Sequence, residues 1–354
     1  VLQKKLPQNQ STESETSNPP QDQINAMVAL YQSGEMTKTE QACRELLQIY
    51  PQTLIVMNVL GGALSGQGKL QEAVQVFDKA IQLKPDYPGV YYNRGLALHA
   101  LSRLDEALES YDKAIQLKPD YIEAYNNRGI TLKKLGQLDE ALKNYDTAIQ
   151  LKPDYAQAYN NRGKALRELG QLNQAIQNYD RAIQLKPDYV EAYYNRAILV
   201  HQLERLDEAL KNYDKAIQLK PDYAKAYSNR GVTLQALGQL EEAIQSYDKA
   251  IQLKPDFAEA YSNQGVTLGG QGKLKESIQV FDKAIQLKPD YTEAYSNLLM
   301  TLNYIPHLNA VEHIELARKF GDIVTNKVRS HSPDYQCLPT PEKLRVGLVS
   351  GDLR

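Results

Sequence analysis

Hydrophobic and small side chains recur along the chain at spacings of three and four residues, which is the periodicity of a helix with one buried face. In the stretch 122–155 they form two such runs, separated by a polar turn at Gly136 and ended by Pro153. The runs consist of Tyr125, Gly129 and Leu132, followed by Ala141, Tyr145, Ala148 and Leu151. Small residues opposite large ones let two helices approach closely, and a proline cannot continue a helix. The stretch therefore predicts a pair of packed helices.

The same two-helix pattern returns at intervals of 34 residues. A Lys-Pro segment ends each unit and precedes Asp-Tyr in all but one, where Phe257 replaces the tyrosine. The prolines are Pro85, Pro119, Pro153, Pro187, Pro221, Pro255 and Pro289. The repeat explains the unusual aromatic composition, because 18 of the 24 tyrosines occupy three positions of the unit and the chain has no Trp. A fixed period of this length is typical of a solenoid of helical pairs.

The chain resembles the tetratricopeptide repeat family in the residues at positions 4, 8, 11, 20, 24, 27 and 32 of the unit. The resemblance implies an all-α fold, a right-handed superhelical solenoid of helix-turn-helix repeats, in which each repeat buries its apolar face against its neighbours. The expected units are 20–53, which is degenerate, and then 54–87, 88–121, 122–155, 156–189, 190–223, 224–257 and 258–291.

The regions outside the eight repeats of 20–291 differ from them in composition. Residues 1–19 are rich in Gln, Ser, Asn and Pro, so we expect a disordered N-terminal segment. Residues 292–330 are expected to form capping and linker helices, beginning with a ninth first helix at Thr292. Residues 331–354 are expected to form a loop and the first strand of a truncated α/β domain, because 344–349 is a short aliphatic run flanked by turn residues.

An aspartate follows the repeat proline and, in four units, stands three residues before a glutamate. This is the spacing of a capping box, so we expect the aspartate to cap the next helix. The pairs are Asp120 with Glu123, Asp188 with Glu191, Asp256 with Glu259, and Asp290 with Glu293.

Charge and cysteine content exclude several classes of function. The 41 Lys and Arg are balanced by 43 Asp and Glu, which argues against a nucleic-acid partner. No apolar run approaches the ~20 residues of a membrane helix. Cys43 and Cys337 are too few for a disulfide framework or a four-ligand zinc site, and the histidines lack metal-ligand spacing, so we expect no metal site. A reducing cytoplasm is the expected location.

Position 6 of the unit is Asn in seven successive repeats, and the family resemblance places it on the concave surface of the superhelix. A row of amides, which both donate and accept hydrogen bonds, is suited to the backbone of an extended peptide. Equally, these amides can bond a neighbouring helix and serve the fold. The candidate peptide-binding residues are Asn93, Asn127, Asn161, Asn195, Asn229, Asn263 and Asn297.

Basic residues gather near positions 9, 12 and 13 of the middle repeats. They are Lys133, Lys134, Lys164 and Arg167, with His99 and His201. Such a stretch can attract an acidic peptide. We favour a solvated face partly neutralised by Glu168 and Glu191, and we expect the arginines at position 7 to serve packing.

The C-terminal residues carry a second resemblance. The segments 297–304, 318–321 and 343–354 are similar to the linker and first catalytic strand of the SPINDLY-like and O-GlcNAc transferase group of protein O-glycosyltransferases. Ser350 and Asp352 match the turn that follows this strand in the family, while Gly351 and Leu353 depart from it.

This resemblance implies a repeat arm that presents Ser/Thr-bearing proteins to a catalytic domain missing from this chain, with UDP-GlcNAc or GDP-fucose as the donor of the parent enzyme. We expect no catalytic residue and no cofactor in the chain itself, because it contains no phosphate loop and no nucleophile with a matching base. Proteins or extended peptides are the expected partners, and a homodimer through the repeat array is possible. The alternative is a free-standing scaffold or adaptor for complex assembly.

Overall fold

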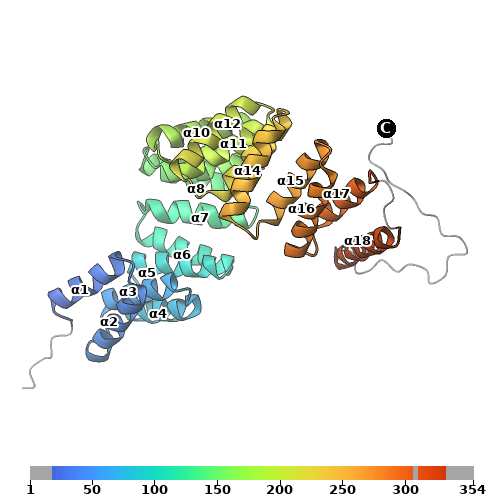
Figure 1. The fold of residues 1–354 in the computed structure, drawn as a ribbon. Helices are drawn as coiled ribbons and strands as arrows, with labels where there is room; N and C mark the ends of the chain where they lie inside the picture. Colours follow the sequence, from blue (N-terminus) through green and yellow to red (C-terminus); the bar gives the residue numbers. More distant parts are fainter. Residues whose placement is uncertain (1–17, 306–309, 332–354) are drawn as a thin grey trace, which may run out of the picture. The chain divides into compact units, whose positions relative to one another are not determined.

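The structure, a computed structural model, describes residues 18–305 and 310–331. Within these residues it contains eighteen α-helices and no strand. Figure 1 shows the helices coloured along the sequence. The predicted all-α repeat fold is therefore confirmed. The helices are α1 (Gln21–Gln32), α2 (Met36–Ile49), α3 (Leu54–Gly66), α4 (Leu70–Leu83), α5 (Pro88–Ala100), α6 (Leu104–Leu117), α7 (Ile122–Lys134), α8 (Leu138–Leu151), α9 (Ala156–Glu168), α10 (Leu172–Leu185), α11 (Val190–Gln202), α12 (Leu206–Leu219), α13 (Ala224–Ala236), α14 (Leu240–Leu253), α15 (Ala258–Gly270), α16 (Leu274–Leu287), α17 (Thr292–Leu302) and α18 (Ala310–His331).

The chain divides into two compact units, Val1–Val200 and His201–Arg354. In the first unit each helix from α1 to α9 packs against the next one along the chain, so the pairs stack one after another. In the second unit the same succession runs from α12 to α18. Sequential packing of this kind is what a solenoid requires, because each pair covers the apolar face of its neighbour.

The two helices of a repeat approach closely at a glycine. A Cβ atom added to Gly129 on α7 would lie 2.6 Å from Cε1 of Tyr145 on α8, closer than any real contact. Tyr145 is fully buried, so the ring has no free space to move into. The predicted role of the small residue at position 8 is therefore seen directly in the structure. The same contact recurs between Gly95 and Tyr111, Gly163 and Tyr179, Gly231 and Tyr247, Gly61 and Phe77, and Gly265 and Phe281.

The turn between the two helices of a repeat requires the left-handed backbone conformation at position 15. Gly136 has a φ of +77° there. Ser102 and Glu204 occupy the same position in their units, with φ values of 60° and 58°. This conformation is costly for residues with a Cβ, so these two turns are strained relative to the glycine turns.

The expectation of capping boxes is wrong for α7, α15 and α17, the three helices with such a pair whose N-cap the structure describes. The residues that precede α7, α15 and α17 are Tyr121, Phe257 and Tyr291, and none of these N-caps has a side-chain hydrogen bond to the helix. Each helix begins one residue later than the capping-box spacing requires, because the aromatic residue takes the N-cap position. The aromatic ring instead contacts the lysine of the Lys-Pro segment, as Lys118 Nζ lies 4.8 Å from the Tyr121 ring centroid.

Three further expectations concern the ends of the chain. Most of the N-terminal segment 1–19, the strand expected at 344–349 and Cys337 lie outside the described residues. The linker region contains α17, which starts at Thr292 as expected, and the long helix α18.

None of the helices in 18–305 and 310–331 is long and apolar enough to cross a membrane.

Candidate functional site

The asparagines at position 6 form hydrogen bonds between successive repeats of the first unit. Each donates its Nδ2 hydrogen to the side chain at position 5 of the preceding repeat. The bonds run from Asn93 to Asn58 Oδ1 at 2.9 Å, Asn127 to Tyr92 Oη at 2.8 Å, Asn161 to Asn126 Oδ1 at 3.0 Å, and Asn195 to Asn160 Oδ1 at 3.0 Å. One N–H of each amide therefore serves the fold. The second N–H and the oxygen remain as hydrogen-bonding groups.

Two of the three asparagines in the second unit differ from those of the first unit in their bonding. Asn229 on α13, Asn263 on α15 and Asn297 on α17 are half-buried. Among the residues that the structure describes, Asn263 and Asn297 form no side-chain bond to the preceding repeat, where position 5 is Ser228 or Ser262. A serine side chain is shorter than that of asparagine or tyrosine, so the amide loses its acceptor.

The basic residues of the middle repeats are mostly engaged with neighbours. Lys133 forms an ion pair with Glu168, with Nζ and Oε1 2.7 Å apart, and Lys134 donates to Ser102 Oγ at 3.1 Å. Lys164 on α9 is half-buried, and burial followed by the nearby Lys133 lowers the pKa of its ammonium group. Arg167 is half-buried on the same helix. His99 and His201 share hydrogen bonds with the hydroxyls of Thr131 and Thr233, respectively.

The position-7 arginines reach the second helix of the preceding repeat. In each case Nε lies 2.6 or 2.7 Å from an aspartate oxygen, which agrees with the packing role expected for them. The pairs are Arg94 with Asp78, Arg128 with Asp112, Arg162 with Asp146, Arg196 with Asp180, and Arg230 with Asp214.

Two of the candidate asparagines, Asn127 and Asn161, line a polar pocket of about 360 Å³ in the first unit. Its walls come from three successive repeats, through α5, α7, α9 and the residues that precede α9 and α11. The lining consists of Tyr92, Glu123, Asn126, Asn127, Ile130, Tyr155, Gln157, Asn161 and Tyr189. The pocket thus brings carboxamides, phenol rings and one carboxylate together at the face where position 6 was expected to bind a peptide.

Sequence reasoning missed the tyrosines of this pocket. Tyr155 and Tyr189 occupy the last position of their repeats, where the recurring Lys-Pro-Asp-Tyr segment suggests only a connection between units. Tyr92 stands at position 5, which is Asn in the next two repeats. The departure from Asn at this position was the signal that could have drawn attention to Tyr92.

The tyrosine hydroxyls of the pocket are held in the neutral form. Burial has the largest effect on their pKa values, nearby tyrosines and carboxylates raise them further, and hydrogen bonds from Asn127 and Asn160 lower those of Tyr92 and Tyr189. Burial is the main cause that raises the pKa of Tyr189 to about 12 and that raises the pKa of Tyr92 and Tyr155. The carboxylate of Glu123, which lines the same pocket, also raises the pKa of Tyr92 and of Tyr155. These phenols therefore act as neutral hydrogen-bonding groups at physiological pH.

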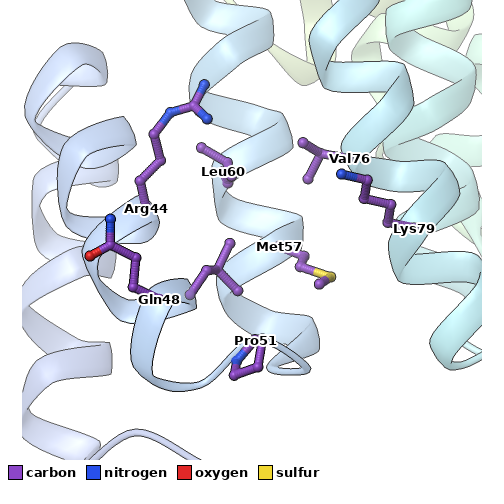
Figure 2. A pocket seen from close by; sticks show the side chains of 8 residues that line it. Arg44, Gln48, Pro51, Met57, Leu60, Val76 and Lys79 are labelled. Atoms are coloured by element: carbon purple, nitrogen blue, oxygen red, sulfur yellow. The ribbon is translucent and has the colours of Figure 1, made fainter.

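A second, apolar pocket of about 460 Å³ lies among α2, α3 and α4 (Figure 2). Met57 and Leu60 from α3 and Val76 from α4 point into it, and the cationic side chains of Arg44 and Lys79 stand at its edges. This pocket contains none of the residues singled out from the sequence. Its apolar lining is typical of the contact surface between repeats.

The repeat assignment is supported by the comparison with known families. Seven stretches match the family described as TPR repeat: 63–102, 97–136, 131–166, 163–204, 199–238, 234–272 and 270–298. Together they span 236 of the 354 residues. The chain therefore belongs to the TPR repeat family.

Solved structures agree with this fold, and 551 chains match, so the fold by itself does not select one function. The APC/C hetero-tetramer Cut9–Hcn1 matches with a TM-score of 0.59 and 16% identity, over 75% of this chain. This chain spans 52% of the length of that protein, and the likeness shows the fold alone.

Two shorter structures also match. YrrB, described as a TPR protein with an unusual peptide-binding site, matches with a TM-score of 0.45 and 25% identity, over 53% of this chain and 97% of its own. MamA matches with a TM-score of 0.43 and 27% identity, over 46% of this chain and 94% of its own. The comparison with curated proteins found no match.

Proposed function

We propose that the chain is a protein-binding repeat scaffold, and that it holds an extended segment of a partner protein against the first-helix face of residues 88–189. The observation that carries this proposal is the polar pocket, because its hydrogen-bonding groups come from three successive repeats. Asn127 and Asn161 each use one N–H within the fold and keep a second N–H and an oxygen for a ligand. Family membership supports the same class of function.

The pocket suits a peptide backbone rather than a small apolar ligand. Amide groups pair with a backbone through one donor and one acceptor each, and they do so whatever the side chains of the peptide are. Ile130 supplies an apolar part of the lining between the two asparagines. A surface of this kind accepts many sequences and relies on neighbouring contacts for selectivity.

The substitution Gln157→Arg tests the location of the binding surface. Gln157 is exposed on α9, lines the pocket and makes no side-chain hydrogen bond within the described residues, so the longer charged side chain should fill the pocket without unfolding the repeat. We expect peptide binding to weaken at least about tenfold. Gln177→Arg, at an exposed site on α10 outside the pocket, is the matched control and should bind as the unmodified protein does. Equal binding by both variants would contradict the proposed surface.

We further propose that this scaffold is the substrate-presenting arm of a SPINDLY-like or O-GlcNAc transferase-like protein O-glycosyltransferase. The proposal rests on the sequence resemblance of 297–304, 318–321 and 343–354, of which 343–354 lies outside the described residues. The arm would contribute effective concentration and orientation of the acceptor hydroxyl, while a separate catalytic domain would use UDP-GlcNAc or GDP-fucose.

The mass and the transferase activity of the native polypeptide distinguish the arm of a transferase from a free-standing adaptor. A mass well above 39.9 kDa, together with transfer of GlcNAc or fucose to protein Ser or Thr, is the expected result. Donor assays with the two nucleotide sugars then identify the sugar. A polypeptide near 39.9 kDa that binds a partner stably, with no transfer from either donor, would contradict the transferase proposal and support the adaptor.

A further inference from the structure

We propose that the polar pocket accepts a basic side chain, Lys or Arg, from the bound peptide, with its cationic group between the tyrosine rings and the carboxylate of Glu123. This inference rests on the proposed peptide-binding function and names the chemistry that the pocket selects. It differs from the acidic partner that the basic residues of the middle repeats suggested.

The carboxylate of Glu123 is the first reason. Glu123 is the second residue of α7 and is exposed at the pocket. Within 18–305 and 310–331 it takes part in no ion pair and accepts no side-chain hydrogen bond. An uncompensated carboxylate beside partly buried rings favours a cationic ligand over a neutral or acidic one.

The tyrosine rings are the second reason. Tyr92, Tyr155 and Tyr189 are half-buried, and the negative face of a phenol ring attracts an ammonium or guanidinium group. The chain already uses this attraction, because Lys152 Nζ lies 5.5 Å from the Tyr155 ring centroid and Lys186 Nζ lies 5.2 Å from that of Tyr189. Both lysines are exposed and are not part of the pocket lining.

Carboxamide oxygens complete the site. Lys and Arg carry hydrogen-bond donors only, and Asn127, Asn161 and Gln157 each offer an acceptor oxygen at the pocket. An aspartate or glutamate of a peptide would meet the carboxylate of Glu123 without such compensation. The lining therefore combines charge attraction, ring contact and acceptors for the same class of side chain.

The basic residues of the same helices do not cancel this preference. Lys133 stands ten residues after Glu123 on α7, which is about 15 Å along the helix and beyond the screening length of about 8 Å at physiological salt. Lys133 is also paired with Glu168. The charge of Lys133 therefore lies at the opposite end of α7 and directs the basic side chain to the Glu123 end.

Short peptides with a single Trp test the inference. The chain contains no Trp, so the fluorescence of the peptide reports binding without a label on the protein. The probes are peptides of about twelve residues, built from Ser, Thr and Ala with a terminal Trp and a central Lys, Arg, Gln or Glu, long enough to cross the three repeats. We expect the Lys and Arg peptides to bind about fivefold to tenfold more tightly than the Gln peptide, and the Glu peptide to bind most weakly.

Glu123→Gln removes the charge and keeps the shape, and it should erase the preference for Lys and Arg while the Gln peptide still binds. Glu109→Gln is the matched control, because Glu109 is exposed on α6 outside the pocket and its loss changes the net charge equally. Equal binding of the Lys and Gln peptides, or equal effects of the two substitutions, would overturn the inference. If none of the peptides binds, the proposed function is overturned as well. The same holds if Gln157→Arg leaves the binding of all of the peptides unchanged.

Discussion

At the scale of the residue, Asn161 illustrates how one side chain serves the fold and offers groups to a ligand. Its Nδ2 donates to Asn126 Oδ1 at 3.0 Å, and Asn126 is only 4% exposed. Removing the donor would leave a buried oxygen without a partner, which costs more than the net gain of an ordinary hydrogen bond. A loss of peptide binding in an Asn161 variant must therefore be separated from a loss of stability.

Asn161→Ala and Asn263→Ala form a matched pair for this purpose. Both remove an Asn from position 6 and gain the same helix propensity, but only Asn161 donates to the preceding repeat. We expect Asn161→Ala to lower the free energy of unfolding by about 1–3 kcal/mol relative to Asn263→Ala. Urea denaturation followed by circular dichroism measures the difference. Equal midpoints would show that the inter-repeat bond does not stabilise the first unit.

The carboxylate of Glu40 is a second residue whose neighbours determine its behaviour. It accepts hydrogen bonds from Lys69 Nζ at 2.7 Å, Arg44 Nη2 through Oε1 at 2.8 Å and Gln67 Nε2 at 2.8 Å, and its side chain is 12% exposed. These partners, Lys69 first and then Arg44, lower its pKa from 4.5 to about 2. Because the folded-state pKa lies below the unfolded one, the stabilisation is present above about pH 4.5 and is lost as the pH falls towards 2.

We accordingly expect Glu40→Gln to destabilise the protein by about 1 kcal/mol at neutral pH and to reduce its loss of stability between pH 5 and pH 2. Glu45→Gln, at an exposed site on the same helix, should keep the acid response of the unmodified protein. Thermal melting at several pH values compares the three proteins. An unchanged acid response in Glu40→Gln would rule out this carboxylate as its source.

At the scale of the element, the helical pair depends on one close approach and on one turn. The approach is the contact of Gly129 with Tyr145, and the turn is the left-handed residue Gly136. Both features follow from residue types at fixed positions, so the pairs could be predicted from the sequence. The N-caps could not, because the Asp-x-x-Glu spacing describes a cap one residue earlier than the one that Tyr121 forms.

Gly129→Ala tests the close approach. The added methyl group would lie 2.6 Å from Tyr145 Cε1, so the two helices or the ring must move. We expect overpacking to lower the free energy of unfolding by about 1–3 kcal/mol, which outweighs the helix-propensity gain of about 1 kcal/mol. Gly270→Ala, at the end of α15 with no atom within 4 Å of the added Cβ, should leave stability unchanged or raise it slightly. The same response to both substitutions, measured by thermal melting, would contradict this account.

At the scale of the whole molecule, stability is distributed along the succession of helices within each unit. A repeat is stabilised by its own packing and by its contacts with adjacent repeats, so an end of the array is stabilised less than its middle. In the first unit α1 buries only Met27, whereas α7 buries five residues. The N-terminal helix should therefore open without the rest.

Hydrogen exchange measures this gradient. We expect the amides of α1 to exchange faster than those of α7 and α9 under conditions that favour the native state, because opening α1 exposes little apolar surface. The helices α5 and α6 serve as an internal reference for a complete repeat. Equal protection of α1 and α7 would show that the unit unfolds as one cooperative block.

The repeat period, the helix pairs and the residues that pack within each pair could be predicted from the sequence alone. These depend on contacts between residues close along the chain, which a periodic pattern records. The tertiary structure decided which amides bond across repeats, as between Asn161 and Asn126, and it brought Tyr92, Glu123 and Tyr189 to one pocket. These residues come from three different repeats, and their distances depend on how the repeats stack, which no local pattern of hydrophobic and polar positions encodes.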